Sequence, residues 1–142
     1  MKKPIINPIC LTSVFDPLYC DFEGISETYG DTNPNDENAV KEVIRKEIIP
    51  DNTQELSKSQ NKIKLTLQYA LSLPPERVQW ESLFGGMPAF DPPDDARLAF
   101  LWVWEEWFPG EDYHIDIYND VDVRDNPSML KRYGLDLPPK PE

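Results

Sequence analysis

The spacing of apolar residues predicts several helices along the chain. The first is expected to begin after Asn33-Pro34, because an asparagine side chain can cap a helix and proline fits its first turn. Pro50 is expected to end this helix, since proline cannot continue the backbone hydrogen bonds. Between these limits, four apolar residues fall on a single helical face: Val40, Val43, Ile44 and Ile48.

Residues 54–73 carry two apolar patterns at once. Helical spacing joins Leu56, Ile63, Leu67, Ala70 and Leu71. Strict alternation, as in a strand, joins Ile63, Leu65, Leu67, Tyr69, Leu71 and Leu73. The length of the segment and its Gln, Glu, Lys, Leu and Ala content favour a helix, while a strand over part of it stays open. A shorter helix is expected over residues 75–84, ending at Gly85-Gly86.

The segment DPPDDARLAFLWVWEEWFPG predicts a central helix over about residues 92–108. Its first residues suit a helix N-terminus, where a side chain caps, proline costs no hydrogen bond and acids favour the dipole: Asp91, Pro92, Asp94 and Asp95. The Pro-Gly pair at its end is expected to stop it. Residues 98–104 are apolar on every face, so this Trp-rich helix should be buried on most sides.

After this helix, residues 113–123 alternate between apolar and polar side chains. This pattern is typical of a half-buried strand, or of a hairpin that turns at Asn119-Asp120. Residues two apart on a strand point to the same side. A strand here would therefore place these polar side chains in one row: His114, Asp116, Asp120 and Asp122. An ordinary solvated strand face produces the same pattern.

Together these elements predict one globular domain over residues 1–142, which the chain length also favours. The expected class is α+β and mainly helical, with three to four helices around the Trp-rich helix and a short strand or hairpin at 113–123. An all-α fold is the alternative. Residues 1–34 contain several prolines and lack helical periodicity, so irregular or short extended structure is expected there. Residues 136–142 are expected to form a flexible tail.

Charge narrows the range of partners. The chain has 26 Asp and Glu residues against 14 Lys and Arg residues, a net charge of −12. Such a protein repels nucleic-acid phosphates and anionic membranes, so neither is an expected partner. The 39% apolar and 11% aromatic content argues against a disordered acidic tail. The longest apolar run, residues 98–104, is far shorter than a membrane span, and no signal-peptide pattern follows Met1, so a soluble cytoplasmic protein is expected.

The negative charge is concentrated in residues 91–125, which hold 11 acidic and two basic side chains. Four of these acids stand in or just after the last turn of the Trp-rich helix, with no base between them: Glu105, Glu106, Glu111 and Asp112. Negative charge at this end opposes the helix dipole. A positively charged partner would relieve the repulsion within this acidic cluster. The alternative is that a distant base, such as Lys41 or Lys58, folds over it.

No catalytic or metal site is predicted, and no cofactor is expected. His114 is the only histidine; His114-x-Asp116 resembles half a metal site or an oriented base, although a solvated histidine is the ordinary interpretation. Residues 120–125 begin like a calcium-binding loop but hold Arg and Asp where that loop needs an oxygen ligand and glycine. Cys10 and Cys20 form no metal or redox motif, so a reduced, partly buried pair is expected rather than a disulfide.

In its size, its acidity and its acidic-aromatic segment from Glu105 to Asp122, the sequence resembles bacterial immunity proteins that neutralise nuclease toxins, including those of contact-dependent growth inhibition systems. The resemblance implies a basic protein partner, the C-terminal nuclease domain of a toxin. Trp80 and Trp107 are the tryptophans expected nearest the surface, and an exposed tryptophan beside carboxylates can anchor an interface. The residues expected to contact the partner are Glu105, Glu106, Trp107, Glu111, Asp112, Asp116, Asp120 and Asp122.

Three other functions remain open from the sequence. A phage-type nucleic-acid mimic that inhibits a DNA-binding enzyme would array its carboxylates along an elongated surface. A small enzyme, which is not the favoured interpretation, would place His114 in a concave pocket with carboxylates and would lose its activity on His114→Ala. A general adaptor would have no basic partner at all.

Overall fold

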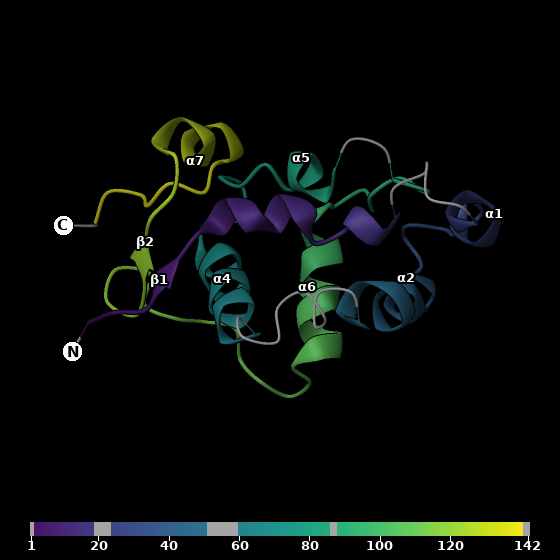
Figure 1. The fold of residues 1–142 in the computed structure, drawn as a ribbon, viewed down its shortest axis with the longest axis horizontal. Helices are drawn as coiled ribbons and strands as arrows, with labels where there is room; N and C mark the ends of the chain where they lie inside the picture. Colours follow the sequence, from purple (N-terminus) through teal and green to yellow (C-terminus); the bar gives the residue numbers. More distant parts are fainter. Residues whose placement is uncertain (1, 19–23, 51–59, 86–87, 141–142) are drawn as a thin grey trace.

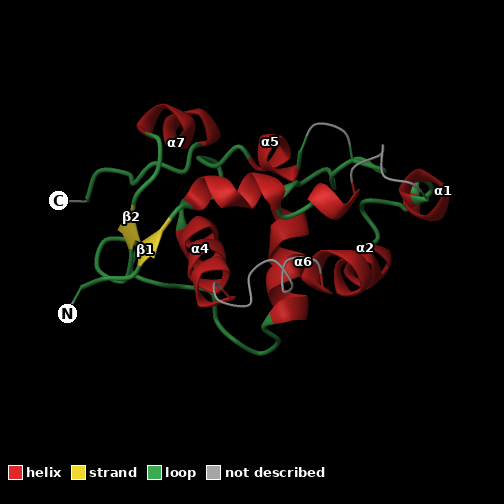
Figure 2. Ribbon diagram, viewed as in Figure 1, coloured by secondary structure: helices red, strands yellow, loops and turns green. Residues whose placement is uncertain are grey.

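The computed structural model describes residues 2–18, 24–50, 60–85 and 88–140. The fold is mainly helical α+β, which confirms the class predicted from the sequence. Helix α6 (Arg97–Trp107) runs through the middle of the molecule, with helices around it and a small sheet at one end (Figures 1 and 2). Within the described ranges, no helix is long and apolar enough to cross a bilayer.

Helix α6 is the buried centre that its apolar run predicted. It ends at Trp107, just before the Pro-Gly pair. Five of its side chains are buried: Ala99, Phe100, Trp102, Val103 and Trp104. The ring of Phe100 lies 5.2 Å from the rings of both Phe15 and Trp80. Trp80 is therefore a core residue, which corrects the expectation that it lies near the surface.

The start of α6 lies later than the predicted position near residue 92, and Asp91 does not cap it. The Asp94 N–H donates instead to the side-chain oxygen of Asn35 at 2.9 Å. The Asp95 carboxylate accepts the N–H of Arg97 at 3.2 Å. The acidic residues ahead of α6 therefore form a loop that contacts another part of the chain, and only the last of them binds the helix terminus.

Helix α2 (Glu37–Val43) continues into a π-helical turn, η3 (Ile44–Ile48), where the first helix was predicted. Both elements pack on α6. The predicted apolar face is confirmed by four buried side chains: Val40, Val43, Ile44 and Ile48. The cap is Asp36, whose carboxylate accepts the Ala39 N–H at 3.2 Å, while Asn33 closes a turn ahead of the helix.

Residues Gln60–Ser72 form helix α4, so the helical interpretation of the segment 54–73 is correct over these residues and the strand interpretation is not. Residues 54–59 of the predicted helix lie outside the described residues. Because α4 contacts both α6 and the N-terminal segment, it is buried on more than one face, and this produces the apparent alternation. Its buried apolar residues are Ile63, Leu67, Tyr69, Ala70 and Leu71. Helix α5 (Trp80–Phe84) follows and is shorter than the predicted 75–84.

The sheet has two short parallel strands, β1 (Ile5–Ile6) and β2 (Asp122–Val123). Ile5 pairs with Asp122, and Ile6 pairs with Val123. The strand predicted over 113–123 is therefore correct only at its end. Its partner comes from the N-terminal segment, so the predicted hairpin is wrong.

A turn explains why residues 113–121 do not form a strand. The Asp116 carboxylate accepts the backbone N–H groups of Tyr118 and Asn119, at 3.0 and 3.3 Å. Such side-chain turns compete with the ladder of a sheet. Tyr113, Ile115 and Ile117 still pack half-buried against the core, and this irregular packing accounts for the alternation in the sequence.

The N-terminal segment contains short helices in addition to β1: η1 (Pro8–Ser13), η2 (Asp16–Leu18) and α1 (Ile25–Tyr29). Leu11 and Leu18 are buried, so this segment, expected to be irregular or extended, contributes to the core. The C-terminal helix α7 (Pro127–Tyr133) covers the turn predicted near Met129. Beyond it, Asp136 pairs with Arg77 at 2.8 Å, and residues 141–142 of the predicted tail lie outside the described part.

Candidate functional site

A cleft of about 400 Å³ lies at the C-terminal end of α6, where the sequence predicted the acidic cluster. Apolar and aromatic side chains form one part of its lining: Leu101, Trp104, Phe108, Pro109 and Tyr113. Charged side chains form the other part: Lys41, Glu105, Glu111 and Asp112. The cleft thus combines aromatic rings with three carboxylates and one ammonium group.

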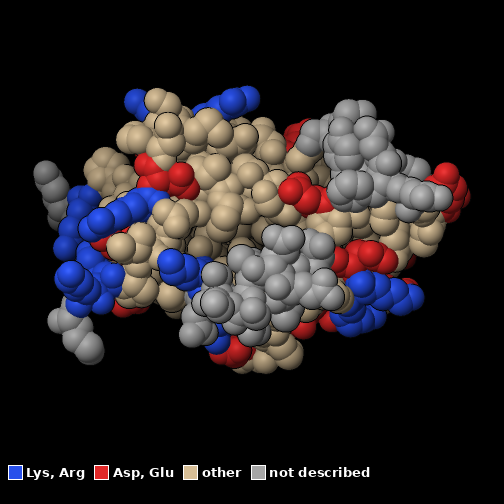
Figure 3. All heavy atoms as spheres, in the orientation of Figure 1, with Lys and Arg blue, Asp and Glu red and all other residues tan. Residues whose placement is uncertain are grey.

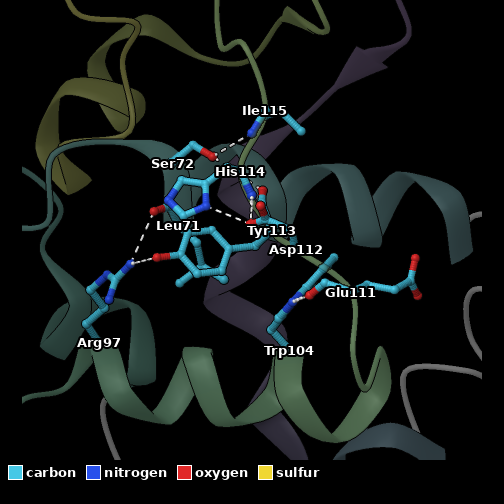
Figure 4. Close-up of polar contacts among 9 residues, drawn as sticks. All are labelled: Leu71, Ser72, Arg97, Trp104, Glu111, Asp112, Tyr113, His114 and Ile115. Atoms are coloured by element: carbon cyan, nitrogen blue, oxygen red, sulfur yellow. Dashed lines mark hydrogen bonds and ion pairs between the residues drawn. The ribbon is translucent and has the colours of Figure 1, made fainter.

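The turn after α6 builds one side of the cleft. Gly110 has a φ of 78°, in the left-handed region that favours glycine. The Glu111 N–H donates to the Phe108 carbonyl at 3.2 Å, so the chain reverses directly after the helix. The indole N–H of Trp104 then donates to the Glu111 carbonyl at 2.9 Å (Figure 4). This bond holds the returning segment against α6.

Tyr113 is held in place from two directions (Figure 4). The Arg97 guanidinium donates to the Tyr113 hydroxyl at 3.1 Å and to the Leu71 carbonyl at 3.2 Å. The Ser72 hydroxyl accepts the Ile115 N–H at 3.0 Å and lies 3.4 Å from the Tyr113 carbonyl. These contacts join the start of α6 and the end of α4 to the segment that lines the cleft, so the aromatic lining is fixed.

All four carboxylates of the acidic cluster have a partner, and for three of them it is a Lys or Arg counter-ion, so the prediction of an unpaired cluster is wrong. The pairs are Lys41 with Glu105 at 3.2 Å, Arg45 with Glu106 at 3.1 Å, Lys64 with Glu111 at 2.6 Å, and His114 with Asp112 at 2.6 Å. The alternative in which Lys41 folds over the cluster is the one observed, and Lys58 lies outside the described residues. Two helices and a π-turn that pack around α6 supply the lysines and the arginine.

Two of these pairs are open to solvent at the cleft. The side chains of Glu105 and Glu111 are 46% and 50% exposed. Exposed ion pairs contribute only about 0–1 kcal/mol to stability. Burial alone would lower the pKa of Lys41, but its hydrogen bonds to Glu105 and Glu37 outweigh this and raise the pKa, so Lys41 stays charged. The carboxylates are therefore neutralised in place without being strongly bound.

His114 pairs with Asp112, and not with Asp116, the neighbour that the His-x-Asp spacing offers. The Asp112 carboxylate accepts the backbone N–H of His114 at 3.0 Å and contacts its Nδ1. These two hydrogen bonds, the backbone one first, hold the pKa of Asp112 below its usual range. The imidazole stacks on Tyr113 with ring centroids 4.3 Å apart, and 67% of the side chain is exposed. His114 is not among the residues that line the cleft.

The predicted contact residues fall into two groups. Glu105, Glu111 and Asp112 line the cleft, and Glu106 and Trp107 adjoin it in the last turn of α6. Trp107 is half-buried and stacks on Phe108 with centroids 5.3 Å apart.

The other group lies outside the cleft lining: Asp116, Asp120 and Asp122. Asp116 and Asp120 bind the turn over 116–120, where hydrogen bonds from Asn119 and Tyr118 lower the pKa of Asp116. Asp122 is in β2 and pairs with Arg124. The predicted row of acceptors does not form, because a turn replaces the strand that would have aligned it.

Lys64, Phe108 and Tyr113 are site residues that the sequence did not single out, whereas Lys41 was named as a base that could fold over the cluster. Phe108 and Tyr113 stand beside the acidic cluster in sequence, so their aromatic character was the available signal. The sequence held no signal for Lys64, because this lysine reaches Glu111 only through the packing of α4 beside α6.

Two further predictions concern metal binding and the state of the cysteines. Within the described ranges, no group of three or more His, Cys, Asp or Glu side chains is arranged to hold a metal ion. Cys10 is a free cysteine; the residue as a whole is exposed, while burial around its thiol raises the pKa of that group to about 11, and Cys20 lies outside the described residues. Comparison with protein-family models, curated proteins and solved structures found no match.

Proposed function

We propose that this protein binds a basic protein partner through the cleft and the acidic cluster around it, and that it acts as an immunity protein for a nuclease toxin domain. The observation that carries the proposal is the cleft itself, in which three carboxylates border fixed aromatic rings. Buried aromatic anchors beside charged groups are typical of the residues that dominate binding energy in interfaces.

The net charge supports a basic partner. A net charge of −12 attracts cationic proteins from a distance and repels nucleic acid. Complementary charge can raise association rate constants towards ~10⁸–10⁹ M⁻¹s⁻¹ at low salt. A nuclease is a suitable target, because a surface that binds phosphates is itself basic.

The arrangement of charge favours this proposal over a nucleic-acid mimic. On the described part of the face drawn in Figure 3, acidic and basic side chains are interspersed, and basic side chains gather at the end that carries the termini. A mimic needs carboxylates in an uninterrupted array. Binding to one toxin domain and to no other basic enzyme supports the immunity function, whereas binding to several DNA-binding enzymes would favour the mimic.

The direct test begins by establishing whether a neighbouring gene encodes a toxin with a basic C-terminal domain, and it then uses that domain as the partner. We expect Glu105→Lys with Glu111→Lys to lower the association rate constant at least about tenfold and to abolish protection of cells that express the toxin. Glu76→Lys with Glu81→Lys is the matched control, because it changes the net charge equally at exposed positions outside the cleft lining. Equal loss in both double variants would show that only total charge matters, and the proposed face would then be wrong.

A further inference from the structure

We infer that the cleft receives an arginine side chain of the partner, and that Lys64 competes with it as the protein's own cation. This inference rests on the proposed function, since it names the group of the basic partner that enters the cleft. It starts from Lys64 on α4, which is not itself among the lining residues but whose ammonium group contacts two of them, Glu111 and Phe108.

Lys64 shows how two residues of the cleft lining, Glu111 and Phe108, bind a cation. Its Nζ lies 2.6 Å from Glu111 Oε1 and 5.1 Å from the centroid of the Phe108 ring. A cation over the face of an aromatic ring is attracted by the electron density of that face. The cleft lining thus offers a carboxylate and an aromatic ring to the same positive charge, and the chain's own lysine occupies this position.

An arginine side chain fits these groups better than a lysine. Its guanidinium is planar, stacks on aromatic rings and can donate two parallel hydrogen bonds to one carboxylate. Glu105 and Asp112 line the same cleft, and an arginine that reached them would share their carboxylates with Lys41 and His114, their partners within the chain. The volume of about 400 Å³ is within the ~300–1,000 Å³ range of sites that bind small molecules, so the cleft has room for one such side chain.

The position of Lys64 makes this binding competitive. Glu111 is half exposed, so its pair with Lys64 is weak and can exchange. An arginine that binds Glu111 must displace Lys64 from the carboxylate and from the Phe108 ring. Removing the charge of Lys64 should therefore strengthen arginine binding, while removing the charge of a lysine elsewhere on α4 should change it little.

The experiment uses two compounds that differ in charge. Nα-acetyl-arginine amide is titrated into the ¹⁵N-labelled protein, with the neutral Nα-acetyl-citrulline amide in parallel. The reporter is the Trp104 indole N–H, because it is bonded to the carbonyl of Glu111. We expect the arginine compound to shift this resonance saturably and the citrulline compound to leave it in place.

The competing role is tested with matched variants. We expect Lys64→Gln to raise the affinity for the arginine compound about fivefold, in line with the loss of one exposed ion pair. Lys62→Gln, at an exposed position on the same helix, makes the same change in net charge and should alter the affinity less than twofold. Equal affinities in the two variants would overturn the competition.

The two proposals fail differently. If neither compound shifts the Trp104 resonance while Glu105→Lys with Glu111→Lys still slows toxin binding, the arginine site is wrong and the proposed function stands. If the arginine compound binds as expected while these substitutions leave toxin binding unchanged, the cleft is a cation site and the proposed interface is wrong.

Discussion

Two glycines have similar backbone conformations but different surroundings, and comparing them shows how closely the C-terminal helix packs on the core. Gly134, which ends α7, has a φ of 69°, and Gly110 has a φ of 78°. A Cβ atom added at Gly134 would lie 1.9 Å from the carbonyl oxygen of Arg77, whereas one added at Gly110 would have no atom within 4 Å. The first position therefore needs glycine for space as well as for conformation.

We expect Gly110→Ala to cost about 1–2 kcal/mol of unfolding free energy, the usual penalty of a left-handed residue with a side chain. Gly134→Ala should cost about 1–3 kcal/mol more, because α7 must move away from the backbone of Arg77. Urea unfolding followed by circular dichroism measures both values. Equal losses would mean that α7 adjusts freely and that its contact with this backbone is not a tight one.

At the scale of elements, the small sheet joins the two ends of the chain. The Asp122 N–H donates to the Pro4 carbonyl at 2.8 Å, and the Arg124 N–H donates to the Ile6 carbonyl at 3.0 Å. The Ile9 N–H adds a bond to the Asp125 carboxylate at 2.9 Å. These bonds link residues more than a hundred positions apart, so β1 holds the segment that leads into α7.

Two adjacent isoleucines in β1 allow the contribution of side-chain packing to stability to be measured separately from that of backbone pairing. Ile6 is completely buried, and Ile5 is 39% exposed. We expect Ile6→Ala to lower the unfolding free energy by about 2–5 kcal/mol and to speed amide exchange at Arg124, because a buried isoleucine leaves a cavity. Ile5→Ala removes the same atoms and should cost less than about 1 kcal/mol. Similar losses at both positions would show that β1 contributes through its backbone bonds alone.

The elements that the sequence predicted well are those with a strong local cause. Helix α2 and the π-turn after it have apolar residues at regular spacing, and α6 has a continuous apolar run followed by a Pro-Gly stop. Neither depends on a distant partner to be recognised, although Pro50 does not end the first helix before it, since residues 49–50 are still helical. The strand over 113–123 was wrong because half-buried residues on an irregular segment alternate just as strand residues do. The true strand pair involves only two residues on each side, and β1 carries no local signal that identifies its partner.

At the scale of the whole molecule, the candidate site was half predictable. The acidic and aromatic residues are neighbours in sequence, so their place at the end of α6 followed from the residues themselves, whereas the cleft between them was not predicted. Of the counter-ions, the sequence named only Lys41, as one of two possible distant bases. Arg45 and Lys64 were not predicted, because they approach the carboxylates only after their elements pack on α6. Pairing lowers the local repulsion while the net charge of −12 remains.

That net charge predicts opposite effects of salt on folding and on binding. Added NaCl shortens the Debye length from about 30 Å at 0.01 M to about 8 Å at 0.15 M, so it screens distant repulsion more than the ion pairs, whose atoms are 2.6–3.2 Å apart. We expect the unfolding free energy to rise by on the order of 1 kcal/mol over this range, measured with urea because it is uncharged. Association with the toxin domain should slow about tenfold over the same range.

The directions of these two salt effects together show whether long-range repulsion or the short ion pairs dominate the electrostatics of the protein. If salt lowered the stability instead, the short ion pairs would outweigh the long-range repulsion, and the carboxylates at the cleft would be bound more firmly to their own lysines than exposed pairs normally are. Lys64→Gln would then destabilise the fold by more than about 1 kcal/mol and leave Glu111 without its counter-ion. A rise in stability together with slower association means that the net negative charge opposes folding while it attracts the basic partner, and that the internal pairs are weak enough to exchange.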